Sequence, residues 1–438
     1  MKKHITIRFQ KIMVYTVILF FFIGIFSGCE KKTVGSDDDL TAIINAVIFD
    51  GENLIEATTV IIKGAFIESV GGEIPSRAIV IDAQGATLMP GLIDSHTHTD
   101  IEGLKDALLF GVTTELEMNG NWTIKQRKKI AERTDIADLR SPGMGVTPKG
   151  GHPTQYMASS GNLLIRFFFR YPAISNPDEA VKFVKKQVSK GADYIKIFIE
   201  DGSCIGFPGL PLPDNETIKA AVDEAHRNNK MAIAHATTLS ESKQAVVLGI
   251  DGLAHLFFDK QPDPEFITEI VSSGAFVIPT LVTLSTAFGN DASELTADKR
   301  VSSRLNKKWL TSLSHSMNVY PQGKIENAFA SVMALHEAGI DILAGSDVSE
   351  PLPILGGLAH GASLHQELKL LVAAGFTPTE ALRAATFVPA RRFALIDRGR
   401  ITSGFRADLL LVDGDPLTNI SDTLSINSVW KNGVKLTL

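Results

Sequence analysis

The residues GLIDSHTHTD (91–100) place His96 and His98 two positions apart, directly after an apolar run. On a β-strand, residues i and i+2 point to the same face, so the two imidazoles would project side by side. Imidazole binds Zn, Fe, Ni and Cu, and two histidines need further ligands to complete a coordination shell. Such pairs also arise by chance in surface strands, so the motif indicates a metal site only if other ligands accompany it.

Further residues of ligating type lie in or at the ends of other β-rich runs. They are Lys196 in ADYIKIF, His235 in MAIAHA, His255 in IDGLAHLF and Asp347 in IDILAGSD. The two histidines could instead be core residues satisfied by backbone groups, and Asp347 could cap a helix. Lys196 is harder to explain, because an unpaired ammonium is costly to bury. The coincidence of all these groups favours one metal centre.

A recurring unit positions these runs along the middle of the chain. An apolar-periodic helix ends at a glycine, and a short β-rich run follows. The glycines are Gly111, Gly191, Gly249, Gly274 and Gly339. Glycine supplies the left-handed residue that ends a helix at low cost. Asn176-Pro177 and Thr377-Pro378 are typical helix starts, the second with a capping box.

Alternating strands and helices predict an α/β fold with parallel strands covered on both faces. About eight units fit between residues 88 and 395, which indicates a (β/α)₈ TIM barrel over 89–399, with its chemistry at the C-terminal strand ends. A doubly wound sheet is the rival, but no Gly-x-Gly-x-x-Gly turn follows an early strand. The β-rich flanks, 40–88 and 400–438, predict one small β-sandwich built from both chain ends.

Composition excludes some functions. The chain has 438 residues, 44% of them apolar and 21% charged, as in a globular protein. A formal net charge of −6 without a basic patch argues against nucleic-acid binding.

The N-terminus has the pattern of a targeting segment. Residues 1–29 combine a basic start with an apolar run that ends in Phe26-Ser27-Gly28-Cys29, a signal peptide with a bacterial lipobox in which Cys29 is lipidated. Phe26 departs from the usual leucine, and an uncleaved membrane anchor is the alternative. Residues 30–39 read as a flexible tether. We therefore expect a protein of the bacterial cell envelope, lipid-anchored to a membrane on the periplasmic or outer face.

Taken in order, these motifs resemble the amidohydrolase superfamily, in particular its imidazolonepropionase-like and prolidase-like metal-dependent dipeptidase branch. The resemblance rests on PGLIDSHTH, the lysine, the two single histidines, the GSD aspartate, and the tail segments LHQELKLLVAAGFTPTEALRAATFVPAR and GRITSGFRADLLLVDGDPL. It extends from residue 40 to the C-terminus. One motif departs from it: many relatives have His-Ala-His-Gly where this chain has His235-Ala236-Thr237-Thr238.

The resemblance implies two divalent metal ions, with zinc as the expected metal. A carboxylated Lys196 would bridge them, His96, His98 and Asp347 would hold the first, and His235 and His255 the second. A hydroxide between the metals would attack the carbonyl carbon, and Asp347 would act as general base and then general acid.

The resemblance also implies the reaction, which is hydrolysis of amide or peptide C–N bonds by a dipeptidase or an N-acyl amino acid hydrolase. Small-molecule or dipeptide-like substrates are the expected partners. The alternatives are a cyclic amide (imidazolone or lactam) hydrolase, an ester hydrolase, or a catalytically inactive binding lipoprotein. The oligomeric state stays open, a homo-oligomer being one alternative.

Several other residues have less specific predictions. His152 in PKGGHPTQY, His360 and Asp94 are candidates for contacting substrate or supporting the ligands. His365 is explained equally well by helix packing, and His226, His315 and His336 by surface or packing positions. The insertion 283–324 carries Arg300, Arg304, Lys307 and Lys308, which could bind a substrate carboxylate or form a solvated helix face.

Overall fold

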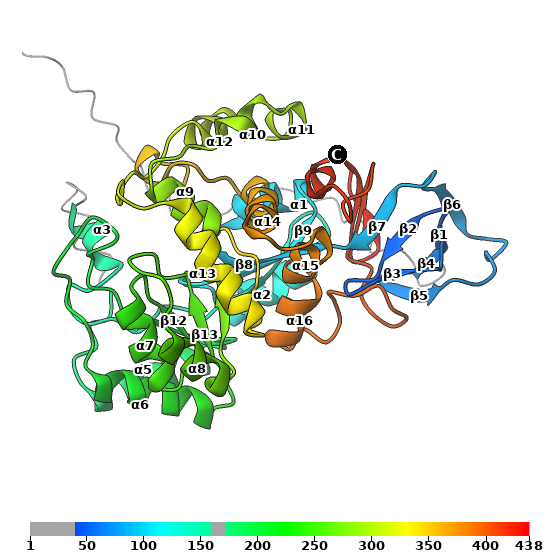
Figure 1. Ribbon diagram of the computed structural model, residues 1–438. Helices are drawn as coiled ribbons and strands as arrows, with labels where there is room; N and C mark the ends of the chain where they lie inside the picture. Colours follow the sequence, from blue (N-terminus) through cyan, green and yellow to red (C-terminus); the bar gives the residue numbers. More distant parts are fainter. Residues whose placement is uncertain (1–39, 160–170, 438) are drawn as a thin grey trace, which may run out of the picture. The chain divides into compact units, whose positions relative to one another are not determined.

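The computed structural model describes residues 40–159 and 171–437 (Figure 1). The predicted signal peptide, tether and lipidated Cys29 lie outside these residues. Within them, none of the helices combines the length and the apolar character needed to cross a membrane.

Two parallel sheets carry the predicted ligand runs. The first has the order β10-β9-β8, and the second has the order β11-β12-β13-β14. Their bounds are β8 Leu92–Thr97, β9 Val112–Glu117, β10 Asp138–Arg140, β11 Ile195–Phe198, β12 Ala232–His235, β13 Gly252–Ala254 and β14 Phe276–Ile278. Most of these strand residues are buried, as expected for strands that are covered on both faces. The parallel pairing expected from the sequence is confirmed.

Isolated parallel bridges extend both sheets. Val146 pairs with Ile197 of β11, so the chain that continues from β10 lies beside the second sheet. Val277 of β14 pairs with Ile342, and Thr97 of β8 pairs with Val348. The segment 342–348, which contains Asp347, therefore lies between β14 and β8.

Helices connect the strands. Those between strands are α1 Ile101–Leu109, α2 Ile124–Ala131, α3 Thr154–Ser159, α5 Pro177–Ser189, α6 Asn215–Arg227, α7 Leu239–Val247 and α8 Pro264–Ser273. After β14 come α9 Leu281–Ala287, α10 Ser293–Ala297, α11 Lys299–Ser302, α12 Lys307–Leu313, α13 Ile325–Glu337, α14 Ala362–Ala374, α15 Pro378–Ala384 and α16 Phe387–Arg392.

The predicted helix ends are confirmed. The five glycines named above all adopt left-handed backbone, with φ between 69° and 91°. The side chain of Asn176 accepts a hydrogen bond from the backbone N–H of Glu179, and Thr377 forms a capping box with Glu380. These local signals set the lengths of the connecting helices and so the places where the strands begin.

The two chain ends share one sheet, with the order β17-β16-β15-β7-β2-β3, whose N-terminal strands are blue and C-terminal strands red in Figure 1. A second sheet has the order β5-β4-β1-β6. The bounds are β1 Leu40–Ile44, β2 Val47–Phe49, β3 Leu54–Ile55, β4 Val60–Lys63, β5 Phe66–Val70, β6 Ile79–Asp82, β7 Thr87–Pro90, β15 Leu409–Val412, β16 Ile426–Lys431 and β17 Val434–Lys435. Apolar side chains from both sheets, such as Ile62, Leu88 and Trp430, form one buried core.

A buried ion network connects β10 to the segment before β15. Asp138 of β10, 1% exposed, pairs with Arg398 and with Arg406, whose Nη1 lies 3.2 Å from its Oδ2. Asp408 pairs with Arg406 at 3.1 Å and with Lys431 at 3.0 Å. Buried charges are tolerated when they are paired in this way, and removal of one partner is costly.

Replacing Asp138 with Ala should therefore lower the free energy of unfolding by about 3–5 kcal/mol, because it removes the buried carboxylate that Arg398 and Arg406 share and leaves their positive charges less compensated in the interior. Asp135→Ala is the control, since it removes an exposed pair with Arg133 and should cost less than about 1 kcal/mol. Urea denaturation measures both variants. Equal losses would contradict the role assigned to the network.

Candidate metal centre

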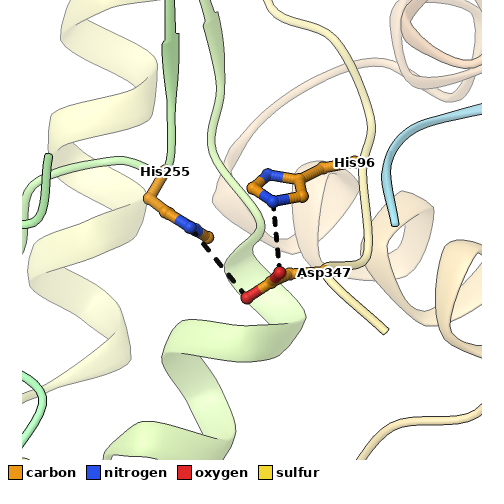
Figure 2. Close-up of side chains that lie close together, drawn as sticks. All are labelled: His96, His255 and Asp347. Atoms are coloured by element: carbon orange, nitrogen blue, oxygen red, sulfur yellow. Dashed lines mark ion pairs between the residues drawn. The ribbon is translucent and has the colours of Figure 1, made fainter. Parts of the chain in front are cut away.

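Three predicted ligands converge at one point. The ligating atoms of His96, His255 and Asp347 all lie within 4.8 Å of one another. Nε2 of His96 is 3.1 Å from Oδ1 of Asp347, and Nε2 of His255 is 4.0 Å from its Oδ2 (Figure 2). Two imidazoles and a carboxylate directed at a common point are a donor set suited to a divalent cation.

The other predicted ligands surround this group. Nε2 of His98 lies 3.2 Å from Oδ1 of Asp347, and the His235 ring centroid lies 4.6 Å from that of His255. All six predicted ligands, Lys196 included, line one cavity. The resemblance implies that His255 and His235 hold the same metal ion. In the structure His255 lies beside His235 and also beside His96 and Asp347.

The protonation states suit metal binding. Burial lowers the pKa of His96 and His235 to about 3, and that of His255 well below its usual value. Burial acts on Asp347 in the opposite direction, but His96 and His255 hold the pKa of its carboxyl well below the usual range. Near pH 7 the site thus offers neutral imidazoles and a carboxylate, the forms that bind metals.

Lys196 is a buried amine that lacks a hydrogen-bond partner. Its side chain is 1% exposed, and Nζ has no acceptor within the described part of the chain. Burial lowers the pKa of this amine to about 7. An orphaned polar atom at such a position requires an explanation. Conversion to a carbamate would supply one, because a carbamate is an anion with two ligating oxygens.

The backbone is left-handed at three positions of the site. The φ angles are 99° at His255, 48° at Thr280 and 54° at Asp347. Such conformations are costly for residues other than glycine and cluster at functional sites. Side-chain hydrogen bonds hold them, because Oγ1 of Thr280 lies 2.8 Å from Nδ1 of His255 and Oγ1 of Thr283 donates to the carbonyl of Ser346.

Asp94 lies behind the ligands, where the sequence suggested a supporting group. Its Oδ1 accepts from the backbone N–H groups of His96 and Ser346, and its Oδ2 accepts from the Ser346 hydroxyl at 2.6 Å. It thereby ties β8 to the segment that carries Asp347. Burial, with the charge of Glu115, raises the pKa of Asp94 to about 7.

Sequence reasoning missed Glu200, which holds the ring of His235. Its Oε2 lies 3.0 Å from Nε2 of His235 and accepts from the Thr237 hydroxyl at 2.6 Å. If Nε2 carries the proton and donates it to Glu200, Nδ1 is left free to bind a metal. Thr237 occupies the position of the second histidine in the His-Ala-His-Gly motif of many relatives. This difference was the sequence signal that a different group supports His235.

We expect Glu200→Ala to weaken metal binding by about 10- to 100-fold, the usual effect of removing a carboxylate that orients a metal-bound histidine. Thr237→Val should have a smaller effect, because Glu200 would keep its contact with His235. Competition against a chelator measures the affinity. Glu265→Ala, at an exposed position on α8, is the control, and unchanged metal affinity in Glu200→Ala would refute the role.

Glu117 at the end of β9 was also missed. It lies 4.0 Å from Nδ1 of His98 and accepts from the Ser141 hydroxyl at 2.6 Å and the Asn119 N–H at 2.7 Å. Burial raises the pKa of this carboxyl to about 7. Glu117 is the last residue of β9, the strand adjacent to β8. The sequence signal that could have identified it is therefore an acidic residue at the end of a predicted strand.

The remaining histidines separate into two groups. His152 lines the cavity, stacks on His235 at 4.3 Å between centroids, and has its Nδ1 2.8 Å from Gln155.

His360 is not among the described cavity residues and pairs with Glu115 at 2.9 Å. His365 is buried between Phe110 and Thr423, which agrees with packing. The others, as predicted, are surface or packing residues: His226, His315 and His336.

The cationic residues of the insertion have a structural role that the sequence did not indicate. Nη1 of Arg300 donates to the Ser421 carbonyl and the Ser425 hydroxyl, and Arg304 donates to the Ile426 carbonyl. These arginines thus bind the C-terminal segment and do not line the cavity. Lys307 and Lys308 are exposed, as on a solvated face.

The cavity in front of the ligands has a volume of about 1080 Å³. Apart from the ligand group, its walls are largely apolar and aromatic. They include Trp122, Phe198, Phe207, Phe258, Leu284 and Met317. A large apolar pocket with a few convergent polar groups is the usual form of a small-molecule site.

Comparisons with known proteins point to one family. The model of the family described as "Amidohydrolase family" matches residues 87–436. An ochratoxinase from Aspergillus niger is 24% identical over 436 residues, covering 88% of this chain and 83% of the relative.

Solved structures share the fold. A Xaa-Pro dipeptidase with bound methionine in its active site aligns with a TM-score of 0.69 and 23% identity, over 91% of this chain and 100% of that one. A putative prolidase from Bifidobacterium longum aligns with a TM-score of 0.69 and 24% identity, over 91% and 95%. At these identities the structural likeness is evidence for the fold alone.

Proposed function

Because the chain belongs to the amidohydrolase family and is a hydrolase that acts on carbon–nitrogen bonds, we propose that it cleaves amide or peptide bonds with two divalent metal ions, zinc being the expected ion. The observation that carries this proposal is the convergence of six ligating groups on one cavity. Neutral imidazoles beside an ionised Asp347 fit such ions.

The proposed division of ligands follows the resemblance. His96, His98 and Asp347 would hold one ion and His235 and His255 the other, with a carboxylated Lys196 between them. When bound, the ions would lower the pKa of a water molecule and polarise the scissile carbonyl. The orphaned, buried Nζ of Lys196 supports the carbamate.

Asp347 is the proposed general base and general acid. Its carboxylate would accept a proton from the attacking water and then donate it to the leaving nitrogen. Its low pKa keeps it ionised before the reaction, and its left-handed backbone aims it at the two histidines. His152, which lies in the cavity beside His235, is proposed to contact the substrate.

Dipeptides and N-acyl amino acids are the proposed substrates. The names of the similar proteins support this choice, since one is a Xaa-Pro dipeptidase and another a putative prolidase.

The domain organisation is part of the proposal. Two parallel sheets and the segments 138–146 and 342–348 would close into a (β/α)₈ barrel over 89–399, which the bridges of Val146, Ile342 and Val348 support. Residues 40–88 and 400–438 would form a composite β-sandwich around their shared core.

For residues 1–39 the proposal is a signal peptide, a lipidated Cys29 and a tether that hold the enzyme at the cell envelope. It rests on the sequence pattern.

Metal content per chain, measured on the protein that starts after Cys29, tests the function. We expect about two equivalents of zinc, hydrolysis of one class within a panel of dipeptides and N-acyl amino acids, and loss of activity on chelation. Less than half an equivalent after growth with added metal would refute the binuclear site and favour a binding protein.

A further inference from the structure

We propose that the substrate carries a large apolar group, such as a long acyl chain or an aromatic ring, which binds a wall of the cavity formed by the insertion after β14. This inference rests on the proposed function and names the substrate class for it. The wall, called here the insertion wall, consists of Leu284, Met317 and Val319 from the insertion, Phe258 from the loop after β13, and Leu352 and Leu355 from the segment after Asp347.

The insertion wall is a built structure. The N–H of Asn318 donates to the Thr286 carbonyl and that of Tyr320 to the Ala287 carbonyl, so the stretch 317–320 lies along the end of α9. The ring of Phe258 packs edge-on against Tyr320 at 5.3 Å between centroids. The part of the wall formed by Phe258 and residues 317–320 therefore has a defined shape before any ligand binds, which reduces the entropy cost of binding.

The wall is also fixed relative to the chemistry. Oγ1 of Thr283, in α9, donates to the carbonyl of Ser346 at 2.8 Å, directly before Asp347. At the start of the same helix, the buried Glu367 accepts hydrogen bonds from the N–H groups of Leu281 and Val282. A group bound on the wall would thus be held at a defined distance from the scissile bond.

A second apolar surface approaches the wall from the loop after β11. Phe207 packs on Tyr156 at 5.5 Å between ring centroids, and both line the cavity. A Cβ atom added to Gly206 would lie 3.5 Å from Cβ of Val319, so this loop reaches the insertion. Apolar side chains therefore border the cavity on both of these surfaces, and burial of an apolar group against them is favourable.

Size and exposure agree with a bulky ligand. The cavity of about 1080 Å³ is slightly larger than the range, about 300–1,000 Å³, that is usual for sites of drug-sized ligands. Leu352 is 49% exposed and the neighbouring Ile354 is 59% exposed, although both line the cavity. Exposed apolar side chains gathered at a pocket mark a binding surface.

Two matched substrate series test the proposal on the metal-loaded enzyme. One varies the acyl chain of an N-acyl alanine from acetyl to decanoyl, and the other varies the amino acid of an N-acetyl amino acid from alanine to tryptophan. In at least one series we expect kcat/KM to rise about three- to fourfold for each buried methylene group. A flat response in both series, with hydrolysis present, would overturn the inference and leave the proposed function intact.

Variants locate the effect on the wall. Val319→Asp and Leu352→Asp should lower kcat/KM for the longest substrate more than tenfold, and by a larger factor than for the acetyl substrate. Leu352 is half exposed, so its variant should fold even if Val319→Asp does not. Val247→Asp is the matched control, because Val247 is 66% exposed on α7 and is not among the described cavity residues. Equal effects of wall and control variants would refute the wall as the binding surface.

Binding to an inactive variant separates the two proposals. Calorimetric titration of Asp347→Asn with the same compounds reports affinity without turnover. Tighter binding of longer compounds, with no hydrolysis by the wild-type enzyme, would support the ligand class and refute the hydrolase. Binding that does not depend on length would refute the ligand class.

Discussion

Asp347→Asn is expected to reduce kcat by at least about a thousandfold. General acid–base groups typically contribute about 10²- to 10⁴-fold, and this substitution also weakens a charged metal ligand. The amide can neither accept the proton of the attacking water nor return it to the leaving nitrogen. Steady-state kinetics with parallel metal analysis measures the change and shows how much of it follows from metal loss.

The control for this variant is Asp341→Asn, directly before the segment that contains Asp347. Asp341 pairs with Arg391 and Arg392 and is not among the described residues that line the cavity. We expect its kcat to change by less than about twofold. An Asp347→Asn enzyme that kept full metal content and more than a tenth of its activity would exclude Asp347 as the proton carrier.

Lys196→Met should abolish activity and reduce the metal content below one equivalent per chain, because the carbamate that would hold both ions can no longer form. The same substitution should stabilise the metal-free protein, by about 5 kcal/mol near pH 6, because it removes a buried ammonium whose pKa falls from its usual 10.5 to about 7 on folding. The two effects have opposite signs, so misfolding cannot account for both. Metal analysis and urea denaturation of the metal-free proteins measure them.

The pH dependence follows from the lowered pKa of Lys196, about 7 in the folded protein. A base whose pKa is lower in the folded state binds fewer protons there, so the metal-free protein loses stability as pH falls from about 10 through 7. Lys196→Met should lack this loss. Above pH 7 the amine is neutral and can react with CO₂, so reconstitution with zinc should depend on bicarbonate and be more complete near pH 8 than near pH 6.

The predictions that depended on local patterns were confirmed. The glycines after the helices, such as Gly191 and Gly274, are left-handed because a helix end requires that conformation within a few residues. The His96 and His98 pair lies at the end of β8, next to the other predicted ligands, since parallel strands bring their C-terminal ends to one edge. The metal-binding roles of these residues stay predictions.

Other features depend on contacts between distant segments. Glu200 and Thr237 are in contact because β11 and β12 are neighbouring strands. The hydrophobic pattern around each residue gives no sign of this contact. Arg300 reaches Ser421 across more than a hundred residues of sequence. The left-handed backbone of Asp347 follows from the hydrogen bonds of Ser346, and such strain is not encoded by the residue type itself.

The sheet shared by both chain ends constrains the order in which the protein can be completed. Leu88 of β7 pairs with Leu411 of β15, so β7 acquires this neighbour only after about 320 further residues have been synthesised. At about 5–20 residues per second, that interval is roughly 15 to 60 seconds. During this time β7 has an unpaired edge of the kind that promotes aggregation. The edge of β7 is therefore open to such contacts for longer than that of a strand whose partner follows it directly in the chain.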